Sequence, residues 1–465
     1  IRYKAEDGDH WLYGTDFEKK EPRKPLQLPN TTAMTGSNTY FCANGIVAAD
    51  RKPHPSYYEV KKVYAEMKIK EKDLENKKFT LINKHLFTDL SEFEIKWVIN
   101  ADGVEVQSGS LGTVKVAPLS ETEITVPYDI KEYENKEYVL ILSFITKEDK
   151  PYCEKGYEQA FDQFIIKEKT DVEETYEPKE VSFSKHEGKI VVNGDGFSLV
   201  IKHGKIVSLK YNEKEYVKTE IKPNFFRPIT DNDLSNTNFV PFLIPLHPYY
   251  RWQKATDKLS GILSGVDRNA DGTLELSFEW DVLSMSGVRS KLTIYPNGKI
   301  KFYLKGTPKG GALLRFGTQF GLVEELDNVK WYGRGPQETY PDSKIGIWEK
   351  TVNDLEHHYM RPQENGNRVD VRYVELTSHD GEKGLKFTSP CATPLAFSAW
   401  HYTQNALEKA THIHNLKHTD ITTFNYDLAQ MGVGGDMPGD AHVREPYILH
   451  SNKEYEYSFT VEPLE

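Results

Sequence analysis

Short alternations of apolar and polar residues dominate most of the chain and predict β-strands. After Lys72 the apolar residues recur at every second position in short runs, and turn-forming residues separate the runs. The predicted strands in this part are residues 79–82, 93–98, 123–126, 138–145 and 160–166. Their spacing predicts a sandwich of roughly 100 residues with an immunoglobulin-like architecture.

The same strand pattern runs from Glu180 to the end of the chain. Residues 292–294 and 300–304 alternate on either side of Pro296-Asn297-Gly298, and Asn-Gly tolerates the positive φ angles of a tight turn, so we predict a hairpin here. Further strands are expected at residues 199–203, 206–211 and 272–282. A pattern of this length predicts one large sandwich. Residues 167–179, which are acidic and without period, are expected to be a linker.

One helix is predicted before the first sandwich. Pro55-Ser56 offers a start, and Val60, Val63, Tyr64 and Met67 recur at helical spacing. Residues 1–55 are irregular and rich in Pro, Gly and Asn, and a loop of that length inside a compact domain is improbable. We therefore expect residues 1–55 to lie against a body that this chain does not contain.

Composition narrows the class of protein. A chain of 465 residues suggests two or three domains of roughly 100–200 residues each. The net charge of −11 argues against a nucleic-acid partner, which needs clustered Lys and Arg. No apolar run approaches the roughly 20 residues of a membrane span, so no membrane partner is expected. Three cysteines, Cys42, Cys153 and Cys391, do not form a disulfide framework.

The sequence starts at Ile1, has no signal peptide there and begins in the middle of a residue pattern. We therefore expect it to continue from a longer polypeptide. Aromatic residues make up 12% of the chain. Tyr and Trp suit contact with sugars, although all-β proteins use many aromatic residues in any case.

Five polar, Gly-rich strings stand out because a plain sandwich does not need them. In chain order, the first to fifth strings are Tyr40-Phe41-Cys42-Ala43-Asn44-Gly45-Ile46-Val47 with its continuation at residues 50–55, Arg227-Pro228-Ile229-Thr230-Asp231-Asn232-Asp233, residues 331–342 (WYGRGPQETYPD), residues 361–368 (RPQENGNR) and residues 430–436 (QMGVGGD).

Together and in this order, the five strings resemble the C-terminal half of the large β-galactosidases of glycoside hydrolase family 2. The resemblance covers essentially the whole chain and implies a mainly β fold. Residues 1–68 would be the C-terminal remnant of a (β/α)8 barrel, with Gly14-Thr15-Asp16-Phe17 near its last strand. Residues 69–170 would be an immunoglobulin-like sandwich, and residues 180–465 a large galactose-mutarotase-like supersandwich. The role of an apparent insertion at residues 18–35 is unknown.

The resemblance also implies a function. Such enzymes cleave terminal β-D-galactosides with retention, using two Glu whose carboxyl groups lie roughly 5–5.5 Å apart. Both Glu and the magnesium ligands would lie upstream, and nothing in this chain matches either motif, so we predict that the chain alone is inactive. It would supply a rim of the active site, part of a sodium site and interface surface. Its expected partners are the galactoside, the missing barrel half and further copies in a homo-oligomer, in the cytoplasm or, alternatively, the periplasm.

Two residues of the first string match the family's sodium site. The backbone carbonyl of Phe41 and the side-chain oxygen of Asn44 would be ligands, and a hard cation prefers such oxygen ligands. The alternative is a buried Phe and a turn-forming Asn before Gly45.

The third string resembles a mobile loop that closes over the galactosidase site. Gly335 would give the backbone freedom, and Gln337 and Glu338 could hydrogen-bond near sugar hydroxyls. A surface turn carrying solvated polar groups is the alternative.

The chain departs from the family pattern upstream of the fifth string. Where well-studied members place a sugar-stacking Trp, this chain has Thr423, followed by Phe424, which could stack on the second sugar if the register shifts by one. The usual Ser-Trp after Asp436 is replaced by Met437-Pro438-Gly439. We therefore expect a leaving-group preference that differs from lactose.

Three further motifs are weaker. The Gly-rich fifth string lacks the Lys and the setting of a phosphate loop, and Asp231-Asn232-Asp233 lacks the Gly and Glu of a calcium loop, so we assign both structural roles. A cluster of His could face a metal ion, but familiar spacings are missing; its members are His412, His414 and His418, with Asp420 near and the pair His357-His358 elsewhere.

Two other classes of protein stay open. A stand-alone carbohydrate-binding module would bind galactosides by itself. A structural adhesion protein would have no use for the five strings.

Overall fold

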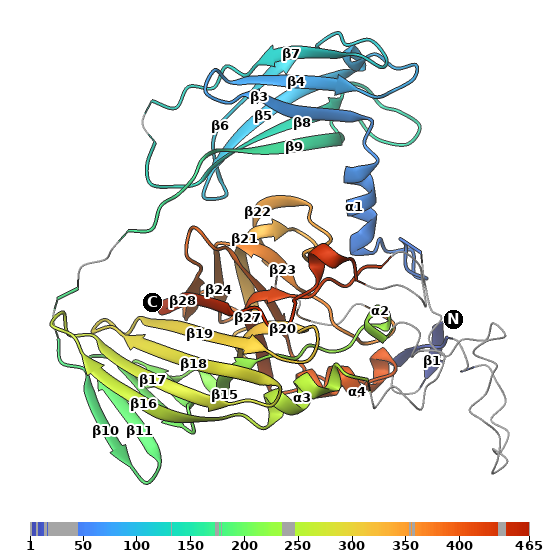
Figure 1. Ribbon diagram of the computed structural model, residues 1–465. Helices are drawn as coiled ribbons and strands as arrows, with labels where there is room; N and C mark the ends of the chain where they lie inside the picture. The colour runs from blue at the N-terminus through green and yellow to red at the C-terminus, as the bar shows by residue number, and fades with distance from the viewer. Residues whose placement is uncertain are drawn as a thin grey trace, which may run out of the picture.

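A computed structural model of the chain describes residues 2–5, 8–13, 16, 45–131, 133–172, 176–177, 179–234, 247–352, 355, 359–435 and 443–464. β-strands dominate, which confirms the mainly β class (Figure 1). No helix in these ranges is long and apolar enough to span a bilayer.

A smaller sandwich follows the first helix. It packs a three-stranded sheet, in the order β3-β4-β7, against a four-stranded sheet, in the order β6-β5-β8-β9. The strands are β3 (Met67–Asp73), β4 (Lys78–Asn83), β5 (Phe93–Ala101), β6 (Val104–Gly112), β7 (Glu121–Thr125), β8 (Tyr138–Thr146) and β9 (Glu158–Lys167). Alternate side chains of each strand face the core between the two sheets. In β5 the side chains of Phe93, Ile95, Trp97 and Ile99 are buried while the intervening residues are more exposed. The five predicted strands are all present, with β3 and β6 in addition.

The predicted helix is shorter than its apolar spacing suggested. Helix α1 spans Pro55–Val63 and begins with Pro in the first turn, as the fixed φ of Pro favours. It ends before Met67, which instead begins β3 and is 2% exposed in the core of the smaller sandwich. Met67 and Ile69 alternate into that core, so burial on a strand overrides the helical spacing at this end.

The large sandwich consists of two long antiparallel sheets. The first has the order β10-β11-β12-β13-β15-β20-β27-β26-β23, with β14 paired to β13, and the second has the order β16-β17-β18-β19-β28-β25-β24-β21-β22. The first sheet contains β10 (Ser182–His186), β11 (Lys189–Gly194), β12 (Phe197–Lys202), β13 (Lys205–Tyr211), β14 (Lys214–Glu215), β15 (Val217–Asn224), β20 (Arg315–Val323), β23 (Arg368–Val371), β26 (Leu395–Trp400) and β27 (Ile421–Gln430). The second contains β16 (Ser260–Arg268), β17 (Leu274–Asp281), β18 (Met285–Ile294), β19 (Ile300–Pro308), β21 (Asn328–Gly335), β22 (Gly346–Val352), β24 (Tyr373–Thr377), β25 (Gly384–Thr388) and β28 (Tyr455–Leu464).

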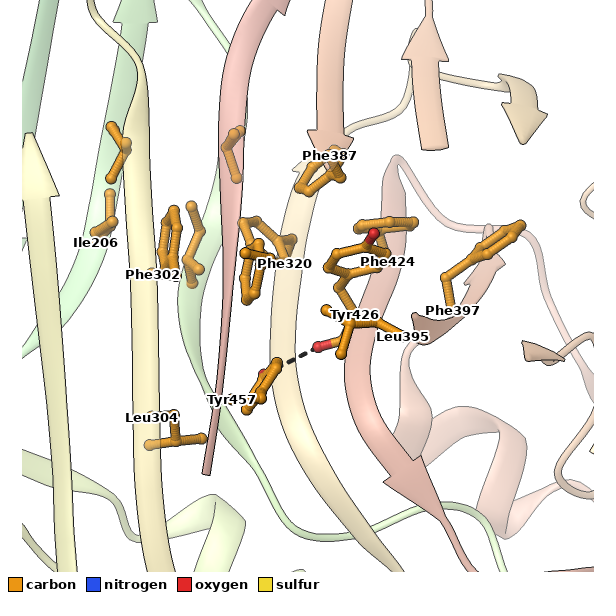
Figure 2. Packing of buried hydrophobic residues seen from close by; sticks show 14 of the residues in the cluster. Ile206, Phe302, Leu304, Phe320, Phe387, Leu395, Phe397, Phe424, Tyr426 and Tyr457 are labelled. Atoms are coloured by element: carbon orange, nitrogen blue, oxygen red, sulfur yellow. Dashed lines mark hydrogen bonds between the residues drawn. The ribbon is translucent and has the colours of Figure 1, made fainter. Parts of the chain in front are cut away.

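The core of the large sandwich lies between these sheets and is rich in aromatic rings (Figure 2). Phe302 and Phe320 pack at 5.6 Å between ring centroids, and Phe320 and Phe387 at 5.1 Å. Since these three residues come from β19, β20 and β25, the ring contacts join both sheets.

The predicted hairpin is formed by β18 and β19, with Ile294 opposite Ile300. Its turn differs from the expected one, because only Gly298 adopts a positive φ, of 85°. The side chain of Asn297 instead accepts a hydrogen bond from the Lys299 amide at 3.1 Å, and so closes a longer loop.

Short elements gather at one end of the large sandwich. Figure 1 shows α1 between the two sandwiches, and α2 (Asp231–Leu234), α3 (Tyr250–Asp257) and α4 (Gln404–Lys409) at the end of the large one. The chain begins with a hairpin of β1 (Arg2–Ala5) and β2 (Gly8–Trp11). Strand β2 packs against the short 3-10 helix η6 (Ile413–Asn415), so residues from opposite ends of the chain meet here.

Candidate functional site

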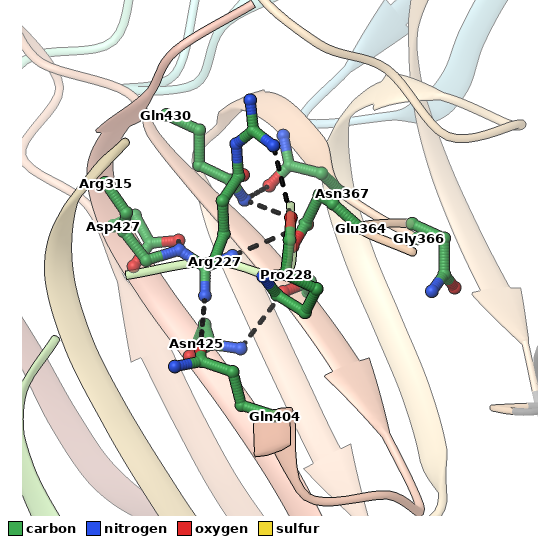
Figure 3. A network of polar contacts seen from close by, with 12 residues as sticks. Arg227, Pro228, Arg315, Glu364, Gly366, Asn367, Gln404, Asn425, Asp427 and Gln430 are labelled. Atoms are coloured by element: carbon green, nitrogen blue, oxygen red, sulfur yellow. Dashed lines mark hydrogen bonds and ion pairs between the residues drawn. The ribbon is translucent and has the colours of Figure 1, made fainter. Parts of the chain in front are cut away.

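A cluster of charged and amide side chains is buried at the end of the large sandwich where the polar strings lie (Figure 3). We call it the buried polar centre. Its members are Arg227, Asp233, Arg315, Glu364, Asn367, Gln404, Asn425, Asp427 and Gln430, all at most 8% exposed. Charged residues are rarely buried so fully unless they are paired, so the partners of each group decide what the centre can do.

Arg227 and Asp233 form a two-pronged ion pair within the second string. The Nη1–Oδ2 distance is 2.7 Å and the Nη2–Oδ1 distance is 3.0 Å. The Thr230 amide donates to the same carboxylate at 2.8 Å, and Arg227 Nη2 donates to the Gly432 carbonyl at 3.2 Å. Asp233 therefore has a structural role, as expected, and Arg227 ties the second string to the fifth.

Arg315 is the second buried guanidinium of the centre. Its Nε lies 3.1 Å from Asp427 Oδ2, and its Nη2 lies 3.5 Å from Glu364 Oε1. Asp427 sits on β27 directly across from Gly317 of β20. A Cβ on Gly317 would overlap the Asp427 carboxyl group, so glycine at this position makes room for the buried acid.

The remaining polar strings meet at the same place. Gln430 Nε2 donates to Asn367 Oδ1 at 2.9 Å and to Glu364 Oε1 at 3.3 Å, which joins the fifth string to the fourth. The Gly434 amide donates to Asp342 Oδ2 at 2.7 Å, which joins the fifth string to the third. The second to fifth strings thus form one contiguous structure, although up to about two hundred residues separate them in sequence.

The third string is held closely by the fourth. Glu338 accepts hydrogen bonds from the Tyr359 hydroxyl and, at 2.6 Å, from the Gly366 amide. Its carboxylate is thus occupied by protein donors, and Gly335 is buried at the end of β21. Gln337, one of the predicted rim residues in this string, lines a cavity of about 250 Å³ between α1, β9 and the third string.

The predicted role of Thr423 and Phe424 in a sugar-binding rim is incompatible with their positions. Both lie on β27, where Thr423 is 3% exposed and Phe424 is 0% exposed. Phe424 packs in the core, with its ring centroid 4.5 Å from that of Phe387 (Figure 2). A side chain enclosed between two sheets offers no face to a sugar, so stacking by Phe424 was a wrong expectation.

The predicted sodium ligands Phe41 and Asn44 lie outside the described residues. Only the end of the first string is described, and His54 there packs its ring 5.9 Å from Tyr359. Because Tyr359 also donates to Glu338, the described part of the first string adjoins the third and fourth strings.

The histidines do not converge on one point. His412 and His414 contact the N-terminal hairpin: the His414 ring stacks on His10 at 3.8 Å, and His412 Nε2 lies 2.7 Å from Asp16 Oδ2. His418 instead packs against His401 at 4.4 Å. Within the described ranges, no group of three or more His, Cys, Asp or Glu is placed to hold a metal ion. His357 and His358, like Asp436, lie outside those ranges.

Several members of the polar centre were not predicted from the sequence. Arg315, Gln404, Asn425 and Asp427 lie outside the five strings. The available signal was weak: in β27 polar residues alternate with Phe424 and Tyr426, a pattern that normally indicates one solvated face. Here that face is buried as well.

The fold and the site define a class of protein: a β-protein of two sandwiches, in which a buried ionic centre joins polar loops that lie far apart in the sequence. The large sandwich matches the family described as "Beta galactosidase small chain" over residues 193–461, and the smaller sandwich matches "Beta-galactosidase, domain 4" over residues 79–167. The chain belongs to the β-galactosidase small chain family.

Curated relatives named β-galactosidase match along nearly the whole chain. The protein from Priestia megaterium is 30% identical over 99% of this chain and 43% of its own length. The protein from Streptococcus thermophilus is 30% identical over 92% of this chain and 41% of its own length. The chain therefore spans less than half the length of the relatives it matches.

Solved structures resemble this chain only remotely. A galactose 1-epimerase from Lactobacillus acidophilus aligns with 61% of this chain and 98% of its own, at 10% identity and a TM-score of 0.31. An aldose epimerase homologue from C. elegans gives 8% identity and a TM-score of 0.32.

Proposed function

We propose that this chain is the C-terminal part of a β-galactosidase that hydrolyses terminal β-D-galactosides with retention. The catalytic Glu pair and the magnesium ligands would belong to a barrel outside this sequence. The chain would contribute the rim of the site, sodium ligands at Phe41 and Asn44, and surface for a homo-oligomer in the cytoplasm. The observation that carries the proposal is the match to proteins named β-galactosidase along 99% of the chain but only 43% of their length.

The positions of the acidic side chains support the prediction that the chain alone does not hydrolyse galactosides. Glu364 is 4% exposed and Asp427 is 0% exposed, and Glu338 is occupied by Tyr359 and Gly366. A retaining pair needs two carboxyl groups that both reach the substrate, roughly 5–5.5 Å apart. In the described structure Glu364 and Asp427 lie against Arg315, and Glu338 accepts from Tyr359 and Gly366.

The buried polar centre is consistent with strings that hold the rim of a site in place. It fixes the second to fifth strings through ion pairs and hydrogen bonds instead of leaving them as separate surface loops. A rigid arrangement of this kind is what a site needs from the residues behind its rim. Gln337 lines an open cavity and is a predicted rim residue that a ligand can reach there.

The test is hydrolysis of a chromogenic β-galactoside by this chain alone and after fusion behind the N-terminal part of the Priestia megaterium relative. We expect no turnover by the chain alone and turnover by the fusion. The anomer released first, followed by NMR, should be β. Turnover by the chain alone would contradict the proposal, as would an α product from the fusion.

A further inference from the structure

The charges inside the buried polar centre do not balance. Asp233, Glu364 and Asp427 can carry three negative charges, whereas Arg227 and Arg315 carry two positive ones. All five side chains are 0% exposed in their ion pairs. A buried charge without compensation is expensive, and a carboxyl group in that position takes up a proton instead.

The hydrogen bonds indicate which acids hold that proton. Asp233 is satisfied as a carboxylate by Arg227 and the Thr230 amide. Among the described residues, Glu364 Oε2 and both oxygens of Asp427 have no well-aligned hydrogen-bond donor, and Asp427 has only the close approach of Arg315 Nε at 3.1 Å. The extra proton therefore belongs to Glu364 and Asp427.

Among the described residues, Arg315 is the positive charge that acts on Asp427. Strand β20 contributes Arg315, and β26, with Ala396 opposite Asp427, contributes no titratable side chain. The fourth string contributes Glu364, and β28 contributes Tyr457, whose pKa burial raises well above its usual value. Burial raises the pKa of Asp427 to about 7, with Arg315 opposing and Glu364 adding to the rise. Burial also raises the pKa of Glu364, with Arg315, Arg227 and the hydrogen bond from Gln430 opposing and the Glu338 carboxylate adding.

We propose that Glu364 and Asp427 share one proton near neutral pH, and that this proton stabilises the packing of β27 and the fourth string around Arg315. Both acids approach the same guanidinium, that of Arg315, so the loss of the proton leaves two negative charges beside one positive charge. The titration belongs to the pair rather than to either residue. The proposal concerns the packing of the strings and does not depend on the proposed function.

The sign of the pH effect follows from linkage. In the unfolded chain Asp427 loses its proton near its ordinary pKa of 3.8, whereas in the folded chain it keeps the proton up to about pH 7. The folded state thus binds more protons between these values, and its stability from this group falls as the pH rises through that window. Above about pH 7 the contribution is fully lost.

The first measurement is the infrared band of protonated carboxyl groups between pH 5 and pH 9. Glu408 is a matched control because burial raises its pKa to about 7 as well, while its carboxylate accepts from the Ile229 amide and the Tyr250 hydroxyl instead. In a Glu408→Gln background we expect a band that titrates near pH 7 and is lost in Glu408→Gln/Asp427→Asn. No titrating band in Glu408→Gln overturns the proposal.

The second measurement is the stability of Asp427→Asn relative to the unsubstituted chain at pH 5 and pH 8. Asn mimics the protonated acid, so the variant should gain relative stability as the pH rises. If Asp427 were a permanently ionised partner of Arg315, the difference would be constant or of opposite sign, and the proposal would fail. Should Asp427→Asn not fold, Glu364→Gln in the same comparison decides the matter, together with the infrared titration of the folded chain.

Discussion

Phe424 lies at the centre of the large core, between rings that come from both sheets. Its ring contacts those of Phe320, Phe387, Phe397 and Tyr426. Replacement of a fully buried Phe by Ala costs about 3–5 kcal/mol, because transfer and cavity terms add. We therefore expect Phe424→Ala to lower the free energy of unfolding by about that amount, as measured by urea denaturation.

Phe87 provides the matched control, since it is 91% exposed in the smaller sandwich. Phe87→Ala should leave the unfolding midpoint within experimental scatter. Equal small effects of both substitutions would contradict the core position of Phe424.

At this scale the sequence predicts which residues are polar and apolar, but not which side of a strand meets another layer. In β27, Phe424 and Tyr426 alternate with Asn425 and Asp427, and the pattern suggests solvent on the polar side. The structure covers that side with α4 and the fourth string: Asn224 donates to both Gln404 of α4 and Asn425, and Gln430 of β27 donates to Glu364. Contacts between residues some two hundred positions apart leave no local trace in the sequence.

Among the elements, the N-terminal hairpin is held by a small set of contacts with the segment around η6. The Tyr13 amide donates to Asp16 Oδ2 at 2.8 Å, and the same oxygen lies 2.7 Å from His412 Nε2. The Tyr13 hydroxyl also donates to the Thr411 carbonyl. Asp16 therefore links the hairpin to the large sandwich.

The pKa of Asp16 gives this contact a pH dependence. Burial acts to raise the pKa, but the Tyr13 amide and His412 outweigh it, so the pKa is lowered. A lowered pKa means that the stabilisation is present above the ordinary value of 3.8 and is lost as the pH falls through the folded-state pKa. We expect hydrogen exchange in residues 8–12 to stay slow at neutral pH and to accelerate, relative to the intrinsic rate, only under strongly acidic conditions.

Asp16→Asn should make exchange in residues 8–12 faster already at neutral pH, because the charged partner of His412 is removed. Asp50→Asn serves as the control, since Asp50 is exposed and contacts its near neighbour Lys52, whose amide donates to it at 3.2 Å and whose Nζ lies 3.8 Å away. Unchanged protection in Asp16→Asn would show that the ring contacts hold the hairpin without the carboxylate.

Strands and turns could be predicted where residues close together in the sequence determine them. The strands of the smaller sandwich and the hairpin of β18 and β19 follow from alternation and turn residues. The end of α1 could not be predicted, because Met67 satisfies both a helical stripe and the inward face of β3, and only packing decides between them. The docking of β2 against η6 depends on stacked His rings, for which sequence spacing gives no rule.

In the whole molecule, the two sandwiches have separate cores but share a buried ionic contact. Glu137 of the smaller sandwich is 7% exposed and accepts from the Tyr332 hydroxyl at 2.7 Å and from Arg372 Nη2 at 2.9 Å, both in the large sandwich. Gln163 adds a pair of hydrogen bonds with the backbone of Ile347, at 3.1 Å and 2.7 Å. These contacts couple the unfolding of the two units.

Glu137→Ala should therefore uncouple the sandwiches. Hydrogen bonds to a charged group contribute about 1.5–3 kcal/mol, and the substitution also leaves the Arg372 guanidinium without its carboxylate. We expect calorimetry to resolve an earlier transition of the smaller sandwich in this variant, with the large sandwich unfolding at nearly its original temperature. Asp195→Ala is the control, because Asp195 pairs with Lys179 at the surface, where both side chains are more than half exposed and such pairs contribute little. If Glu137→Ala and Asp195→Ala give the same calorimetric trace, the two sandwiches are coupled by other contacts, and the ionic pair between them is not what sets their joint stability.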